Sequence, residues 1–90
     1  MPSVNFTQAL KRFYPQLESL NLEANTVKEV LEAVELQFPG IKSYLVDDQG
    51  RLRKHVNVFV NGSLIKDREK LMDAVSSDSE IYIMQALSGG

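Results

Sequence analysis

The residues with the clearest chemical character in this sequence are the two glycines that end the run "QALSGG". Glycine has no Cβ, so Gly89 and Gly90 can adopt backbone angles that other residues cannot adopt, and they can approach the walls of a narrow channel more closely. At about 3.3–3.6 Å per extended residue, the segment from Leu87 to Gly90 spans about 13 Å, enough to enter the active site of another protein. A terminal carboxylate accepts a nucleophile only after activation. These residues therefore indicate a reactive chain end, and the alternative is an ordinary disordered terminus.

Other residue types that carry chemistry are sparse. The chain has no cysteine, which excludes disulfides, thiolate zinc sites and a cysteine nucleophile. His55 is the single histidine and has no neighbouring carboxylate pattern, so a surface position explains it better than a metal site. The pair Asp47-Asp48 could bind a cation, but a turn is the better explanation. We therefore expect no metal site, and the sequence shows no glycine-rich phosphate loop and no catalytic triad.

The composition is that of a small globular protein. Its 90 residues suffice for one domain, with 43% hydrophobic residues, 24% charged residues and a net charge of -2. No apolar run approaches the roughly 18 residues of a membrane span, and we expect no signal peptide. The lack of cysteine favours the cytoplasm. The tightest basic group, Arg51, Arg53 and Lys54, is typical of a solvated turn, so we expect binding to neither nucleic acid nor membrane.

Alternating apolar residues predict two strands near the N-terminus. In "SVNFT", Val4 and Phe6 lie on one side, which indicates a half-buried strand. In "LESLNLE", Leu20 and Leu22 repeat the pattern. Pro15 separates the two because it cannot donate to a strand ladder. The simplest arrangement is an N-terminal hairpin.

A capping box marks the start of a helix. Thr26 is followed three residues later by Glu29, so each side chain can bond a backbone amide at the helix start, the glutamate reaching that of Thr26. Pro39-Gly40 ends the helix, and Leu36 points away from its apolar stripe. The stripe, at helical spacing, consists of Val27, Val30, Leu31, Val34 and Phe38.

The second half of the chain predicts mainly strands. "IKSYLVDDQG" indicates a short extended piece that ends in a turn at residues 47–50. The strand signal is strongest in "HVNVFVNG", where Asn61-Gly62 is a preferred hairpin turn. A charged loop with a short helical turn then leads into the final strand, "IYIMQAL". The inward residues expected in these two strands are Val56, Val58, Val60, Ile81 and Ile83.

The order of elements predicts an α+β fold in two layers, with one main helix on one face of a mixed sheet. Phe59, Tyr82 and Met84 then project from the opposite face, with Asn57 and Gln85 at the rim. Such an exposed apolar group is typical of a partner-binding surface. The alternatives are that a loop covers it, or that singly exposed apolar residues carry no function.

The segments "HVNVFVNG", "SSDSEIYIM" and "QALSGG", together with the element order, resemble the ubiquitin-like β-grasp family. The likeness is to sulfur carriers such as the small subunit of molybdopterin synthase and the thiamine-pathway carrier. Among these, the chain is most similar to the carrier that feeds a cysteine synthase. The resemblance implies a four- to five-stranded mixed sheet on one main helix. Residues 1–87 would form the β-grasp domain and residues 88–90 a flexible tail.

The resemblance also implies a mechanism. An adenylyltransferase of the ubiquitin-activating type would use ATP to adenylate Gly90, while Leu87, Ser88 and Gly89 thread into its active site. Sulfur from a donor protein would displace AMP and leave a thiocarboxylate for a sulfur-accepting enzyme such as a cysteine synthase. The chain would then be a cosubstrate rather than an enzyme, with no cofactor of its own. Acidic residues near the last strand are normally solvated but could meet basic groups on the activating enzyme: Asp73, Asp78 and Glu80.

Three other functions remain open at this point. A ubiquitin-like protein modifier would join Gly90 to a lysine of a target. A small subunit of molybdopterin synthase would insert its tail permanently into a larger partner. A plain interaction domain would retain its function without Gly89 and Gly90.

Overall fold

The computed structural model describes residues 1–12 and 14–85 of the 90-residue chain. The strands are β1 (Ser3–Phe6), β2 (Leu20–Asn21), β3 (Val56–Val60), β4 (Ser63–Leu64) and β5 (Glu80–Gln85). The helices are α1 (Gln8–Lys11), α2 (Val27–Gln37) and α3 (Lys42–Leu45). No helix in these described ranges is long and apolar enough to cross a membrane.

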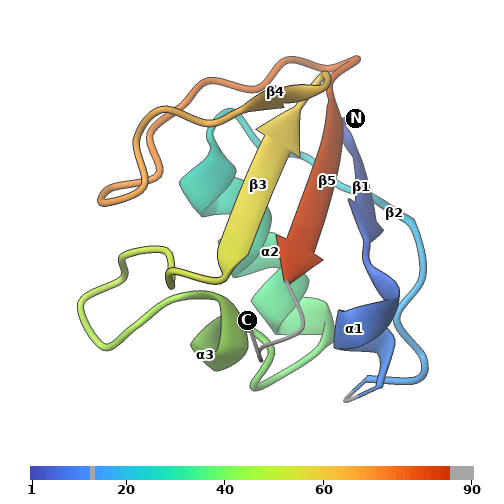
Figure 1. The fold of residues 1–90 in the computed structure, drawn as a ribbon. Helices are drawn as coiled ribbons and strands as arrows, with labels where there is room; N and C mark the ends of the chain where they lie inside the picture. Colours follow the sequence, from blue (N-terminus) through green and yellow to red (C-terminus); the bar gives the residue numbers. More distant parts are fainter. Residues whose placement is uncertain (13, 86–90) are drawn as a thin grey trace.

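The five strands form one mixed sheet in the order β2-β1-β5-β3-β4. The last strand, β5, therefore lies at the centre, parallel to β1 and antiparallel to β3. Figure 1 shows α2 running behind the sheet, while the front face of β3 and β5 carries no helix. This arrangement confirms the predicted two-layer α+β fold and the N-terminal hairpin between β1 and β2.

The core lies between α2 and the inner face of the sheet. The alternation seen in the sequence is confirmed in β1, β3 and β5, whose inward side chains are buried, Val60 only partly. The stripe on α2 is confirmed as well, with Phe38 at its partly buried edge and Leu36 84% exposed. Completely buried side chains from these elements include Val4, Val27, Val30, Val34, Val56, Val58, Ile81 and Ile83.

The start of α2 differs in one bond from the predicted capping box. Thr26 Oγ1 accepts from the Glu29 N–H at 3.2 Å, as expected. The Glu29 carboxylate, however, accepts from the N–H of Asn25 at 2.7 Å, not from that of Thr26. A β-bridge between Thr26 and Ala74 keeps the chain extended just before the helix, and the glutamate meets the earlier amide. Both bonds satisfy donors near the helix start.

The prediction of an extended piece at the beginning of "IKSYLVDDQG" is wrong, because α3 forms there. Ile41 and Leu45 are both buried, and a spacing of four places them on one face of a helical turn. The Glu35 carboxylate accepts from the backbone N–H groups of Gly40 and Lys42, both at 2.8 Å. Tertiary burial and a carboxylate from α2 thus stabilise a helix too short to show periodicity in the sequence.

Helix α1 is a second short helix that the sequence pattern did not predict. Its single buried residue is Leu10, which is completely enclosed in the core. Four residues give only one turn, so no apolar stripe can repeat. By contrast, the Asn61-Gly62 turn is confirmed, with φ angles of 52° and 85° that the hairpin requires.

Candidate functional site

The outer face of the sheet carries a row of aligned side chains. The strand register places Phe59 opposite Tyr82 and also opposite Leu64, while Asn5 of β1 lies beside Tyr82. Residues paired directly across adjacent strands project from the same face of a sheet. Met84 lies two residues farther along β5 on this face. We call Phe59, Leu64, Tyr82 and Met84 the apolar patch.

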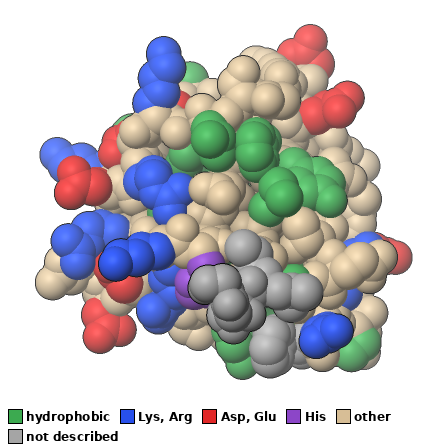
Figure 2. Space-filling view, viewed as in Figure 1, with side chains coloured by type: hydrophobic (Ala, Val, Ile, Leu, Met, Phe, Trp, Pro, Cys, Tyr) green, Lys and Arg blue, Asp and Glu red, His purple; other side chains and the backbone are tan. Residues whose placement is uncertain are grey.

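Much of the apolar patch is accessible. Leu64 is 53% exposed, Tyr82 41% and Met84 36%, and Phe59 is half-buried. A hollow of about 380 Å³ lies against three of these side chains, with Asn5 at its edge. Figure 2 shows hydrophobic side chains gathered over β3, β4 and β5 on the face that no helix covers. The predicted outward placement of Phe59, Tyr82 and Met84 is confirmed, and their role in partner binding remains a prediction.

The predicted rim of the patch is only half correct. Asn57 lies opposite Met84 on the outer face and is half-buried, as expected. Gln85 lies opposite Val56 and, by alternation, on the inner face with Ile83. Its side-chain Oε1 is buried and has no hydrogen-bond partner among residues 1–12 and 14–85. The strand period, which fixed Tyr82 and Met84 as outward, excludes Gln85 from the same rim.

The predicted tail lies outside the described residues. This includes Leu87, Ser88, Gly89 and Gly90, as well as the expected boundary between residues 87 and 88. In the sequence these residues follow β5 almost at once, since β5 ends at Gln85. The strand that carries half of the apolar patch is therefore the one that leads into residues 86–90.

Leu64 is a member of the apolar patch that the sequence patterns did not predict. The signal was present in the hairpin: a two-residue Asn61-Gly62 loop pairs Val60 with Ser63, and therefore Phe59 with Leu64. Because Phe59 faces outward, its partner must do so too. The hairpin register implied by the Asn61-Gly62 turn is thus the sequence signal that points to Leu64.

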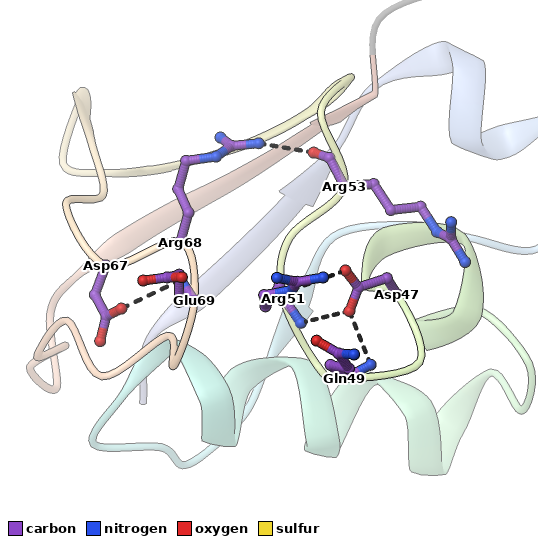
Figure 3. A network of polar contacts seen from close by, with 7 residues as sticks. All are labelled: Asp47, Gln49, Arg51, Arg53, Asp67, Arg68 and Glu69. Carbon is purple, nitrogen blue, oxygen red and sulfur yellow. Dashed lines mark hydrogen bonds and ion pairs between the residues drawn. The ribbon is translucent and has the colours of Figure 1, made fainter.

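Polar residues from two loops form a separate network beside β3 (Figure 3). The Asp47 carboxylate accepts from the backbone N–H groups of Gln49 and Arg51 at 2.9 and 3.0 Å and forms an ion pair with the Arg51 guanidinium at 3.1 Å. This confirms the turn expected at Asp47-Asp48. His55 is exposed, as expected. Within the described ranges, no three His, Cys, Asp or Glu side chains lie close enough together to hold a metal ion.

Carboxylates also organise the loop between β4 and β5. The carboxylate of Asp67 accepts from the N–H groups of Glu69, Lys70 and Met72. The carboxylate of Asp73 accepts from those of Lys66 and Asp67 at 3.0 and 2.8 Å. The backbone bond from Leu71 N–H to Asp67 O is the short helical turn expected here. Asp73 thus has a structural role, which differs from the solvated or enzyme-facing position expected from the sequence.

These hydrogen bonds lower the pKa values of three carboxyl groups. The Lys70 N–H is the main cause for Asp67, and the Arg51 N–H for Asp47, each lowering the pKa from its usual 3.8. The Gly40 N–H is the main cause of the lowered pKa of Glu35. In each case the bonds favour the charged form, and the partial burial that opposes it is the weaker effect.

The lowered pKa values predict that the fold becomes less stable in acid. Since the folded pKa values lie below the unfolded ones, the carboxylates stabilise the fold above about pH 4, and this stabilisation is lost as the pH falls through the folded values. Urea unfolding between pH 7 and pH 3 should show the loss. Asp67→Asn should lower stability at pH 7 and flatten this pH dependence. The control Asp48→Asn removes a neighbour of Asp47 that takes no part in the Asp47 hydrogen bonds, so an equal flattening would contradict the assignment.

Comparison with known proteins agrees with this fold. The profile of the ThiS family matches residues 4–90. The sulfur carrier protein CysO of Mycobacterium tuberculosis is 27% identical over 75 residues, 81% of each chain. The small archaeal modifier protein 3 of Haloferax volcanii is 28% identical over 65 residues, covering 72% of this chain and 70% of the relative.

A solved structure extends the likeness to three dimensions. A chain in the BexX/CysO complex of Amycolatopsis orientalis superimposes with a TM-score of 0.84 and 26% identity, and the match covers 100% of both chains. This superposition agrees with the fold described above, with its central β5 and its single main helix, and with the family resemblance seen in the sequence. The chain belongs to the ThiS family and has the ubiquitin-like β-grasp fold.

Proposed function

We propose that the chain is a sulfur carrier whose C-terminal Gly90 is adenylated and then converted to a thiocarboxylate. The thiocarboxylate donates sulfur in the biosynthesis of cysteine or a related metabolite. The observation that supports this most directly is the family match, which runs through Gly89 and Gly90. The sulfur carrier CysO among the relatives supports the cysteine branch.

The proposed chemistry takes place at the terminal carboxylate. A carboxylate oxygen of Gly90 attacks the α-phosphorus of ATP, and pyrophosphate leaves. A sulfur nucleophile, HS⁻ in its simplest form, attacks the acyl carbon and the bond to AMP breaks. The thiocarboxylic acid then loses a proton. None of these steps is an oxidation or a reduction. ATP is bound by the activating partner. The use of ATP agrees with the cytoplasmic location expected from the cysteine-free sequence.

In this scheme the chain supplies geometry rather than acid–base groups. The apolar patch binds the adenylyltransferase, and β5 directs the glycines toward its active site. A rigid sheet suits this task because positioning the reacting carboxylate lowers the entropic cost of the bimolecular step. A sulfur donor protein and a sulfur-accepting enzyme such as a cysteine synthase complete the proposed set of partners.

Reconstitution would test the proposal. The full chain is incubated with an adenylyltransferase from the same organism, ATP and sulfide, and its intact mass is measured. We expect the mass to rise by the difference between a sulfur and an oxygen atom, localised to Gly90. If pyrophosphate is released but the chain never gains sulfur, the carrier function is wrong.

The likeness to small archaeal modifier protein 3 supports a second function, conjugation to lysine. Its activation step is the same, but the nucleophile is an amine. Covalent adducts on a denaturing gel that disappear when Gly90 is deleted would favour this function over sulfur transfer.

The apolar patch gives a prediction about partner affinity. Tyr82→Ala should weaken binding to the adenylyltransferase about 10- to 30-fold, because aromatic side chains in an interface centre contribute about 1.4–2 kcal/mol or more. Isothermal titration calorimetry would measure this. Leu36→Ala is the matched control, since Leu36 is 84% exposed on α2, behind the sheet. Equal affinities for the two variants would exclude the apolar patch as the docking surface.

A further inference from the structure

Arg68 is held against the start of β3 by three neutral acceptors. Its guanidinium donates to the Asn57 side-chain oxygen at 3.0 Å, to the Arg53 carbonyl at 2.7 Å and to the Val56 carbonyl at 2.9 Å. Figure 3 shows the Arg53 side chain pointing away from Arg68, toward α3, where it donates to the Ser43 carbonyl. These bonds fix the position of the Arg68 charge without neutralising it.

This fixed charge lines a hollow that is distinct from the one at the apolar patch. The hollow has a volume of about 570 Å³, and we call it the basic hollow. Its charged or titratable lining comprises Arg51, Arg53, Lys54, His55 and Arg68 with the carboxylates Asp47 and Glu69. Four arginine or lysine side chains therefore face two carboxylates, in a chain whose net charge is -2.

One of those carboxylates is already neutralised. Asp47 is in an ion pair with Arg51, the one ion pair found within residues 1–12 and 14–85. Arg53, Lys54 and Arg68 have no carboxylate within 4.0 Å in the same ranges. Lys54 is also exposed, so it can reach a partner without rearrangement of the loop.

The basic hollow adjoins the apolar patch. Arg68 bonds to Asn57, and Asn57 lies directly opposite Met84 of the patch. Figure 2 shows Lys and Arg side chains, interspersed with Asp and Glu side chains, on one side of the hydrophobic group, and Asp and Glu side chains near the end where β5 begins. Glu80 lines the hollow at the patch itself. An excess of positive charge therefore lies on one side of the apolar patch, and negative charge lies near the end where β5 begins.

We propose that the basic hollow receives a carboxylate side chain of the activating enzyme, which orients the chain as the apolar patch docks. This inference rests on the proposed function, because it names the chemistry of the partner at the same face. Charge complementarity at an interface edge governs association rate and orientation more than affinity. A charge asymmetry across the face favours one binding orientation over the reversed one, and in the proposed orientation β5 points toward the active site.

The experiment measures association of the full chain with its adenylyltransferase by stopped-flow at low and high salt. Lys54→Glu should lower the association rate constant roughly 3- to 10-fold at low salt, with the difference shrinking as salt rises. Lys54 is exposed and lies outside the core, so thermal unfolding of Lys54→Glu should match that of the wild-type chain. Lys28→Glu is the matched control, an equal charge reversal at an exposed position on α2, behind the sheet. Carbodiimide cross-linking of the wild-type complex should join Lys54 to an Asp or Glu of the enzyme.

Two outcomes would overturn the inference. The first outcome is that the association rate constant of Lys54→Glu and its salt dependence equal those of Lys28→Glu, while the wild-type chain is adenylated normally. The other is a second copy of this chain as the occupant, seen as self-association in sedimentation that Lys54→Glu abolishes. If the wild-type chain itself is never adenylated, the proposed function fails instead, so the two failures are distinguishable.

Discussion

Deletion of Gly89 and Gly90 is expected to reduce adenylation of the chain about 100-fold or more. A misplacement of about 1 Å at a reacting group can by itself cost about 100-fold in rate, and the deletion moves the carboxylate by two residues. ATP–pyrophosphate exchange with the adenylyltransferase measures the effect. The physical claim is that the position of the carboxylate, rather than its mere presence, determines reactivity.

Two controls make this result specific. An added alanine after Gly90 preserves both glycines but moves the carboxylate by one residue, and it should also abolish exchange. Thermal unfolding should be unchanged in both variants, because the core of the described structure is built from residues 4–83. Full exchange activity in the shortened chain would show that the two glycines are not needed for adenylation, which would contradict the physical claim.

Ile81→Ala is expected to have the largest effect on stability. Ile81 is completely buried in the central strand, paired with Val4 of β1 on one side and Val60 of β3 on the other. Truncation of such a residue leaves a cavity and costs about 2–5 kcal/mol, a large part of the about 5–15 kcal/mol that stabilises a typical domain. The melting temperature should fall by about 10 °C or more.

The neighbouring residue provides the contrast. Tyr82→Ala truncates a side chain on the opposite face of the same strand, 41% exposed, and should cost about 1 kcal/mol or less. Guanidinium unfolding of both variants measures the two costs. Ile81→Ala should lose stability but should bind the adenylyltransferase normally under conditions in which it remains folded. Tyr82→Ala should keep most of its stability but should bind the adenylyltransferase more weakly. Similar stability losses in the two variants would contradict the assignment of inner and outer faces.

Local patterns in the sequence were sufficient for the faces of the main strands. Alternation in residues 56–60 and 80–85 correctly placed Ile81 inward and Tyr82 outward, because the strand period of two acts on each residue independently. The same period, applied one residue farther, would have placed Gln85 inward. The Asn61-Gly62 turn was also predictable, since positive φ angles at two successive residues strongly restrict residue choice.

Features that depend on distant segments could not be predicted in this way. Helix α3 forms because Ile41 and Leu45 are buried and because Glu35 of α2 satisfies backbone donors at its start. The basic hollow exists because Arg68 reaches across to the carbonyls of Arg53 and Val56. In the sequence, Arg68 is one charged residue in a polar loop, and nothing local marks it as fixed beside the apolar patch.

The sequence by itself determined the types of the longer elements, the Asn61-Gly62 turn, and the inward and outward residues of the long strands. These depend on backbone preferences and side-chain periods over a few residues. The tertiary structure alone decided that β5 lies at the centre of the sheet, that Phe59 lies beside Tyr82, and that a fixed cationic hollow adjoins Met84. Those arrangements depend on contacts between residues far apart in the chain, and such contacts form only when the whole core is buried.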